Sequence, residues 1–176
     1  MRIIAGAWRG RRISAPKGDA VRPTLDRVRE AWMSMVHTSL PDARVLDLCA
    51  GSGALGLEAL SRGAAWVDFV ENDPTAFRVL QENAKSLGAG TRCALHREDA
   101  LAFLGRTQWR PDGTPPYGVA FADPPYRSRL AGVLSDSWLK QPFAAIFGVE
   151  HEASEQLPAG GDTRRYGDTS LTIYRT

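Results

Sequence analysis

The tetrapeptide Asp123-Pro124-Pro125-Tyr126 contains the residue types needed to hold a flat amine. The exocyclic amine of a nucleobase is a poor nucleophile, because its lone pair is delocalised into the ring. If the Asp123 carboxylate and the Pro124 carbonyl accept its two N–H bonds, the lone pair points in a third direction, toward a methyl donor. The Tyr126 ring can stack on the base, an interaction worth about 1–3 kcal/mol. The motif therefore indicates methyl transfer to an amine, in which alignment supplies most of the catalysis.

A glycine-rich turn at 51–56 lies between an apolar run at 45–48 and a helical pattern at 55–60. A strand, a glycine turn and a helix are the start of a nucleotide-binding βαβ unit. The glycine spacing also satisfies the dinucleotide fingerprint, so this turn alone leaves a nicotinamide cofactor open. Asp47 stands before the glycines, however, where it would repel a pyrophosphate and attract a cation. Together with the motif at 123–126, this favours S-adenosylmethionine and a nucleobase as the two ligands.

Acidic residues also follow the next two predicted strands. The strand predicted at 65–71 ends in Glu71, one strand away from the glycine turn, where a single carboxylate can accept from two ribose hydroxyls. The strand predicted at 92–96 is followed by Asp99. This residue can cap a helix beginning at Ala100 or accept a hydrogen bond from an adenine amine, and the sequence leaves both roles open.

A doubly wound α/β sheet would bring these residues to one edge, because ligands bind at the carboxyl ends of its parallel strands. The run at 119–122 is apolar throughout, so it is expected to be a central strand that delivers the motif at 123–126. The hydrophobic periodicity predicts the other elements. In chain order they are helix 24–38, strand 45–48, helix 55–60, strand 65–71, helix 75–88, strand 92–96, helix 100–104, strand 119–122, helix 127–139, strand 143–150 and a closing hairpin at 163–166 and 170–175.

The basic residues are concentrated in the first 29 positions. This segment holds eight lysines and arginines against two aspartates, a net charge of +6, and the rest of the chain carries −4, for a total of +2. A basic arm on a near-neutral body suggests a polyanionic partner, although a solvated surface segment would have the same composition. Trp8 lies among arginines in a hairpin predicted at 2–6 and 11–14. It can stack on RNA bases or pack the hairpin onto the body, and both alternatives stay open.

The length of 176 residues and the hydrophobic content of 43% fit one globular domain. We expect a single methyltransferase domain over 1–176, with an N-terminal extension at 1–40 and a cofactor-binding core at 41–176. No apolar run is long enough to cross a membrane and the N-terminus does not resemble a signal peptide, so a cytoplasmic location is expected. The two cysteines and three histidines show no metal-ligand spacing, so no metal is expected.

Four motifs along nearly the whole chain resemble the RsmD family of bacterial methyltransferases, which modify N2 of one guanine in small-subunit (16S) ribosomal RNA. The resemblance implies a class I SAM-dependent, Rossmann-like fold. Its sheet has seven mostly parallel strands with the last strand antiparallel, preceded by an N-terminal β-hairpin and helix. The motifs are RIIAGAWRGRR at 2–12, RPTLDRVRE at 22–30, DLCAGSGALGLEAL at 47–60 and DPPY at 123–126.

The resemblance also implies roles for individual residues. The expected partner is 16S ribosomal RNA within an assembled or assembling small subunit, and we expect the protein to be a monomer. Many relatives carry phenylalanine at the position of Tyr126, which preserves stacking. The predicted catalytic residues are Asp123, Pro124 and Tyr126; the predicted cofactor-binding residues are Asp47, Gly51, Ser52, Gly53, Glu71, Asn72, Asp99, Ala100, Arg22 and Thr24; and the predicted RNA-binding residues are Trp8, Arg9, Arg11, Arg12 and Arg27.

Other activities are compatible with parts of the sequence. The motif at 123–126 alone permits methylation of adenine N6, cytosine N4 or a protein glutamine, and the basic N-terminal arm argues against these acceptors. A non-catalytic RNA-binding module would not need Asp47, Glu71 and Asp123 together. A nicotinamide enzyme has no use for an amine-binding motif at the end of the fourth strand.

Overall fold

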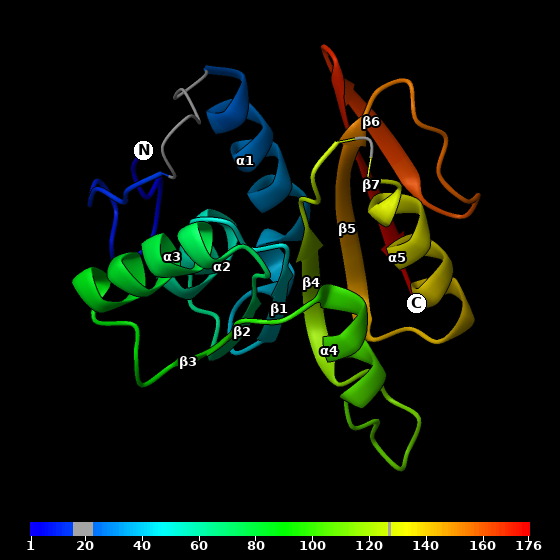
Figure 1. Cartoon of the computed structure of the whole chain (residues 1–176), viewed down its shortest axis with the longest axis horizontal. Helices are drawn as coiled ribbons and strands as arrows, with labels where there is room; N and C mark the ends of the chain where they lie inside the picture. Colours follow the sequence, from blue (N-terminus) through cyan, green and yellow to red (C-terminus); the bar gives the residue numbers. More distant parts are fainter. Residues whose placement is uncertain (16–22, 127) are drawn as a thin grey trace.

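A seven-stranded sheet runs through the centre of the computed structural model, which describes residues 1–15, 23–126 and 128–176, with the side chains of 23–26 not included (Figure 1). The strand order is β3-β2-β1-β4-β5-β7-β6. Every strand is parallel to the others except β7, which pairs antiparallel with β5 and β6. The predicted class I methyltransferase sheet is therefore confirmed. The strands are β1 (Arg44–Leu48), β2 (Trp66–Val70), β3 (Cys93–His96), β4 (Tyr117–Ala122), β5 (Ala144–Glu152), β6 (Asp162–Tyr166) and β7 (Thr169–Arg175).

Helices cover both faces of the sheet and build a separate core on each. One core joins α1, α2 and α3 to strand residues such as Val45 and Phe121. The other joins α4 and α5 to the alternate strand residues, such as Leu46 and Ala122. Strands covered on both faces must be apolar at successive positions, which explains the continuous runs in the sequence. The helices are α1 (Pro23–Val36), a 3-10 turn η1 (His37–Ser39), α2 (Ala54–Ser61), α3 (Pro74–Leu87), α4 (Ala100–Arg106) and α5 (Leu130–Lys140).

Two predicted elements are shorter than expected. The helix predicted from 127 begins only at Leu130, because Arg129 before it has the left-handed φ of 57°. The N-terminal hairpin has no strands of its own. It forms a single antiparallel bridge between Arg2 and Arg12, because several N–H groups of 4–8 donate to α2 instead of across the hairpin. Residues 153–161, between β5 and the closing hairpin, form turns and loops.

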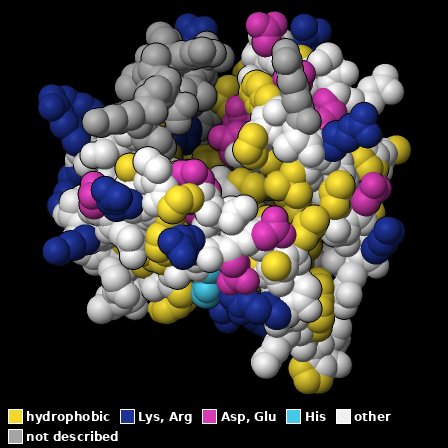
Figure 2. Space-filling model, viewed as in Figure 1, with side chains coloured by type: hydrophobic (Ala, Val, Ile, Leu, Met, Phe, Trp, Pro, Cys, Tyr) yellow, Lys and Arg dark blue, Asp and Glu magenta, His cyan; other side chains and the backbone are white. Residues whose placement is uncertain are grey.

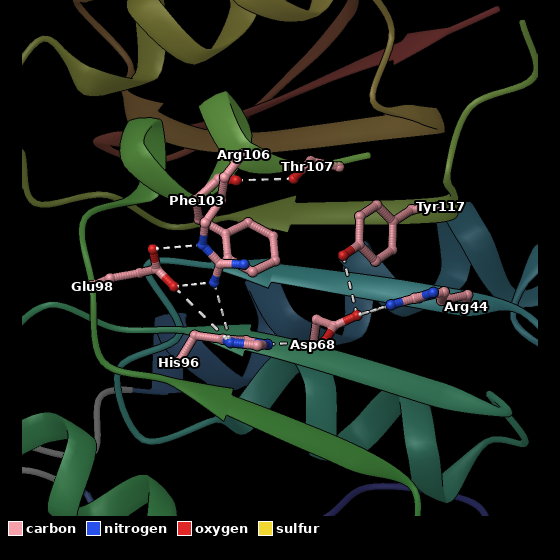
Figure 3. Close-up of polar contacts among 8 residues, drawn as sticks. All are labelled: Arg44, Asp68, His96, Glu98, Phe103, Arg106, Thr107 and Tyr117. Carbon is pink, nitrogen blue, oxygen red and sulfur yellow. Dashed lines mark hydrogen bonds and ion pairs between the residues drawn. The ribbon is translucent and has the colours of Figure 1, made fainter. Parts of the chain in front are cut away.

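A buried carboxylate joins β2 to three other strands (Figure 3). Asp68 lies in the middle of β2 and is almost fully buried. Its Oδ2 atom accepts hydrogen bonds from the Arg44 guanidinium at 2.8 Å and the Tyr117 hydroxyl at 3.1 Å. The Nε2 atom of His96 lies 3.0 Å from Oδ1. Asp68 thus holds the first four strands in register below the edge where ligands are expected.

Candidate functional site

An open cleft of about 1220 Å³ lies at the carboxyl ends of the parallel strands. Figure 2 shows hydrophobic and acidic side chains gathered along the middle of this face, between the two halves of the molecule. This is the edge at which doubly wound sheets bind ligands. The cleft brings together most of the residues predicted from the sequence. They are Asp47, Gly51, Ser52, Glu71, Asn72, Asp99, Ala100, Asp123, Pro124 and Tyr126.

The strand register explains why distant residues meet here. Leu48 of β1 is level with Val70 of β2 and Ala122 of β4. Ala122 is in turn level with Val149 of β5. In parallel strands the next positions also lie side by side along the sheet edge. Across β2, β1, β4 and β5 these next positions are Glu71, Cys49, Asp123 and Glu150.

Asp47 lies beneath the glycine turn and shapes it. Its Oδ2 atom accepts the backbone N–H of Gly56 at 2.9 Å, and burial raises the pKa of Asp47 to about 7. A Cβ atom at Gly56 would lie 2.3 Å from the Phe69 ring, so only glycine fits at this approach of helix to strand. Gly53, the residue before α2, has a φ of 80° and is buried under the turn rather than lining the cleft.

The Glu71 carboxylate is oriented by two backbone groups. Its Oε2 atom accepts the N–H of Gly51 at 2.7 Å, and its Oε1 atom accepts the N–H of Asp73 at 2.7 Å. A carboxylate has about four acceptor positions, so each oxygen can still accept a further hydrogen bond from a donor in the cleft. Two fixed oxygens at the rim of the glycine turn suit the vicinal hydroxyls of a ribose.

Asp99 caps α4, which was one of the two roles predicted for it. Its Oδ1 atom accepts the N–H groups of Leu101 and Ala102 at 2.9 and 3.0 Å. The neighbouring Glu98 carboxylate binds Arg106 at the other end of α4 (Figure 3). These bonds fix the loop after β3, and Asp99 faces the cleft from it. Its predicted bond to an adenine amine stays a prediction.

The motif at 123–126 presents both of its ends to the cleft. Asp123 is exposed, whereas Pro124 is buried against the body. The Tyr126 ring keeps 44% of its surface exposed. Its hydroxyl lies 2.5 Å from Thr169 Oγ1 and donates to Glu150 Oε1 at 3.3 Å. Burial raises the pKa of Tyr126 to about 12, so the phenol stays protonated. Its contacts with Glu150 on β5 and Thr169 on β7 hold the ring at the cleft.

Trp8 packs inward, which supports the packing alternative over RNA stacking. Only 9% of its surface is exposed, its backbone N–H donates to Ser61 Oγ at 2.9 Å, and the Arg92 guanidinium lies 4.9 Å from its ring centre. Both the body and Arg92 cover the ring, so it has little surface left for an RNA base. The other predicted RNA-binding residues, Arg9, Arg11, Arg12 and Arg27, are exposed.

Two predicted cofactor residues cannot be compared with the geometry. Arg22 lies outside the described residues, and the same holds for the side chain of Thr24, whose backbone is in α1. The sequence analysis missed several residues that line the cleft, among them Glu150. Glu150 ends an apolar run just as Glu71 does, and this similarity was the signal available for it.

Known proteins share this fold over the whole chain. The family model described as conserved hypothetical protein 95 matches residues 1–175. The Escherichia coli K12 ribosomal RNA small subunit methyltransferase D is 40% identical over 163 residues, which are 90% of this chain and 78% of that protein. A solved hypothetical protein of Thermus thermophilus is 32% identical, with a TM-score of 0.84 over 100% of this chain and 99% of the other.

A more distant solved structure shares the fold alone. It is the Thermus thermophilus 16S rRNA N2 methyltransferase RsmC in complex with AdoMet and guanosine. The sequence identity is 17%, with a TM-score of 0.67 over 91% of this chain and 44% of that one.

Proposed function

Because the chain belongs to the RsmD family, described as conserved hypothetical protein 95, we propose that it methylates the exocyclic N2 amine of a guanine in small-subunit ribosomal RNA, with S-adenosylmethionine as donor. The observation that carries the proposal is the common cleft of two groups of residues. The amine-binding residues Asp123 and Tyr126 line the same cleft as Asp47 and Glu71 at the glycine turn. The methyltransferase names of the relatives support this assignment.

The charge of the cleft suits S-adenosylmethionine better than a dinucleotide. Eight carboxylates and one guanidinium are among the described residues that line it. Such a surface attracts the sulfonium and ammonium groups of S-adenosylmethionine and repels a pyrophosphate. The half-buried Glu71 carboxylate, held by two backbone N–H groups, fits the ribose hydroxyls. The residues present therefore fit this cofactor.

The chain contributes positioning and acceptor groups. When bound, S-adenosylmethionine supplies an electrophilic methyl group. The Asp123 carboxylate and the Pro124 carbonyl accept the two N–H bonds of the amine and so aim its lone pair at the methyl. The Tyr126 ring supports the plane of the base. The Asp123 carboxylate is also positioned to accept the proton that the amine loses after transfer.

A paired base cannot enter the cleft, so the target guanine must be unpaired or flipped out. The exposed arginines at 9, 11, 12 and 27 can hold the phosphates around it. We propose that the substrate is an assembled or assembling small subunit. We also propose a monomer, because one chain supplies both the cofactor-side and the acceptor-side residues. A cytoplasmic location is proposed because the relatives are named as ribosomal RNA methyltransferases.

Product analysis tests this function directly. Purified protein and radiolabelled S-adenosylmethionine would be incubated with small-subunit particles from cells that lack the activity. Digestion to nucleosides and mass spectrometry should then detect N2-methylguanosine, and an Asp123→Ala protein should give none. N6-methyladenosine or N4-methylcytidine would assign a different acceptor. No labelled nucleoside at all would contradict the proposed function.

A further inference from the structure

Glu150 is a cleft residue with no assigned role. It lies on β5, directly after Val149, which is level with Ala122 before Asp123. Glu150 and Asp123 are therefore neighbours on adjacent strands at the ligand-binding edge. Neighbouring strands are about 4.8 Å apart, so the two carboxylates can contact two neighbouring polar groups on the edge of one base.

The Glu150 side chain is held firmly. Only 5% of its surface is exposed. Its Oε1 atom accepts a hydrogen bond from Tyr126. Burial raises its pKa, while Trp32 and the Tyr126 hydroxyl oppose the shift. A carboxylate has about four acceptor positions, and these two neighbours use at most two of them. Glu150 can thus accept a hydrogen bond from a further donor in the cleft.

Guanine offers such a donor beside the reacting amine. Its Watson–Crick edge carries N1–H next to the N2 amine, whereas adenine N1 and cytosine N3 are acceptors without a proton. When Asp123 binds the amine, the ring can be oriented so that N1 faces Glu150 on the neighbouring strand. We propose that Glu150 accepts the N1–H of the target guanine and makes the site specific for this base. This inference rests on the proposed function, since it requires a guanine amine at Asp123.

The selectivity follows from desolvation. An acceptor base would turn a ring nitrogen toward a buried carboxylate, so neither group would have a proton to share. Leaving a buried polar group unpaired in this way typically lowers affinity by about tenfold to hundredfold. A site that hydrogen-bonds one substrate group rejects analogues that lack it for the same reason.

A competing explanation is that Glu150 only positions Tyr126. The hydroxyl of Tyr126 contacts both Glu150 and Thr169, so loss of Glu150 could misplace the ring. A Tyr126→Phe variant separates the two roles. It removes the hydroxyl contact, keeps the ring and leaves the carboxylate in the cleft.

The test compares guanosine with 2-aminopurine riboside, which has the same 2-amine but no proton on N1. Binding of 2-aminopurine riboside to the S-adenosylhomocysteine-loaded protein is followed by its fluorescence, and guanosine is added as competitor. The wild-type protein should favour guanosine by about tenfold to hundredfold. The amide of Glu150→Gln can turn its oxygen to N1–H of guanosine or its N–H to N1 of 2-aminopurine, so this variant should lower the ratio by about tenfold relative to the wild type, whereas Tyr126→Phe should keep it. The O6 difference between the nucleosides cancels when the ratios of two proteins are compared.

Three results would overturn the inference. They are a wild-type protein without preference (including one that binds neither nucleoside), a Glu150→Gln protein that keeps the full preference, and a Tyr126→Phe protein that loses it equally. If Glu150→Gln does not fold, Glu150→Asp replaces it. This variant keeps the acceptor on a shorter side chain, so it should still favour guanosine, by a smaller ratio.

Methyl transfer to small-subunit particles is measured in parallel with the wild-type protein. Formation of N2-methylguanosine without a nucleoside preference would reject the proposed role of Glu150 but leave the proposed function standing. A nucleoside preference without any methylated guanosine would reject the proposed function and leave the role of Glu150 in base recognition.

Discussion

Asp47 is nearly fully buried beneath the glycine turn, with 1% of its surface exposed, and its protonation should control cofactor binding. Its pKa of about 7 means that the carboxyl is largely neutral in mildly acidic solution. A cationic cofactor binds the ionised form better, so affinity for S-adenosylmethionine should increase as the pH rises from about 6 to 8, by up to tenfold per pH unit below the pKa. Calorimetric titration at several pH values measures this.

The matched variant for this prediction is Asp47→Asn, which removes the titration and keeps the shape. It should bind S-adenosylmethionine more weakly than the wild type at pH 8 and with little pH dependence. Asp99→Asn serves as control and should retain the dependence, because Asp99 is exposed. A flat pH profile for the wild-type protein would exclude Asp47 as the controlling group.

Asp123 should be needed for turnover rather than for cofactor affinity. Replacement by alanine removes the acceptor that orients the amine, so kcat should fall by at least about a hundredfold. S-adenosylmethionine affinity, measured by calorimetry, should change little, because the proposed function assigns Asp123 to the methyl acceptor. Asp123→Asn keeps one acceptor oxygen and should lose less activity. Turnover close to wild type in Asp123→Ala would refute the amine-positioning mechanism.

The sequence predicted the cleft residues that end an apolar run, because strand ends meet at one sheet edge whatever the details of packing. Glu71 and Asp123 were predicted in this way. Glu150 ends such a run too, but its place beside Asp123 depends on the β4–β5 register, which the sequence does not state. For Trp8 the sequence left packing and RNA stacking equally open, and it could not show that the ring is buried. Its burial depends on Ser61 and Arg92, which come from parts of the chain that local patterns cannot connect.

At the scale of elements, the Asp68 network should hold β2 to its neighbours. Burial raises the pKa of Asp68, but hydrogen bonds from His96 and Arg44 outweigh burial and lower it. A lowered folded pKa contributes stability above the unfolded value of about 3.9, and this contribution is lost as the pH falls through the folded pKa. Asp68→Asn should lower the free energy of unfolding by about 1.5–3 kcal/mol at pH 7, and by less near pH 3.

Urea unfolding at the two pH values tests the network. Asp162→Asn is the control, because the Asp162–Arg164 pair on β6 is exposed and lies 3.7 Å apart. Exposed pairs contribute about 0–1 kcal/mol, so this variant should remain near wild type at both pH values. Equal losses in the two variants, or a loss in Asp68→Asn that does not change with pH, would contradict the proposed ion network.

Element boundaries were less predictable than element types. The strand pattern 2–6 and 11–14 indicated a hairpin, yet the backbone of 4–8 bonds mainly to α2. Glu58, which is fully buried, accepts the N–H groups of Ile4 and Ala5 at 2.7 and 3.0 Å. A helix residue that replaces a strand partner leaves no periodic signal, so the sequence could not distinguish a free hairpin from one bonded to a helix.

At the scale of the whole molecule, α2 connects the two regions that the proposed function needs. Its first residues follow the glycine turn of the cleft, and its last turn holds the N-terminal segment through Glu58 and Ser61. Figure 1 shows this segment beside α2 and α3, on the side of the molecule away from β6. Residues 4–8 are therefore fixed relative to the acidic cleft, and under the proposed function the neighbouring arginines at 9, 11 and 12 would give RNA a defined path to it.

The last prediction concerns this basic arm. Arg9, Arg11 and Arg12 are exposed, so reversing all three to glutamate should weaken binding of small-subunit RNA without altering S-adenosylmethionine affinity. Removal of one arginine–phosphate interaction reduces the slope of log affinity against log salt by about 0.7–0.9. Removal of three should therefore reduce it by about 2–3. Filter binding of the RNA between low and moderate salt concentrations measures the slope.

Lys140→Glu provides the control for charge, because Lys140 is exposed at the end of α5, far from the arm (Figure 1). It changes net charge but should leave the slope nearly unchanged if binding is local to the arm. A similar decrease per reversed charge in both variants would mean that the RNA senses only the total charge of the protein. An unchanged slope in the triple variant would instead leave the arginines without a phosphate partner. Only a decrease specific to the arm agrees with a guanine delivered from a fixed basic surface into the acidic cleft.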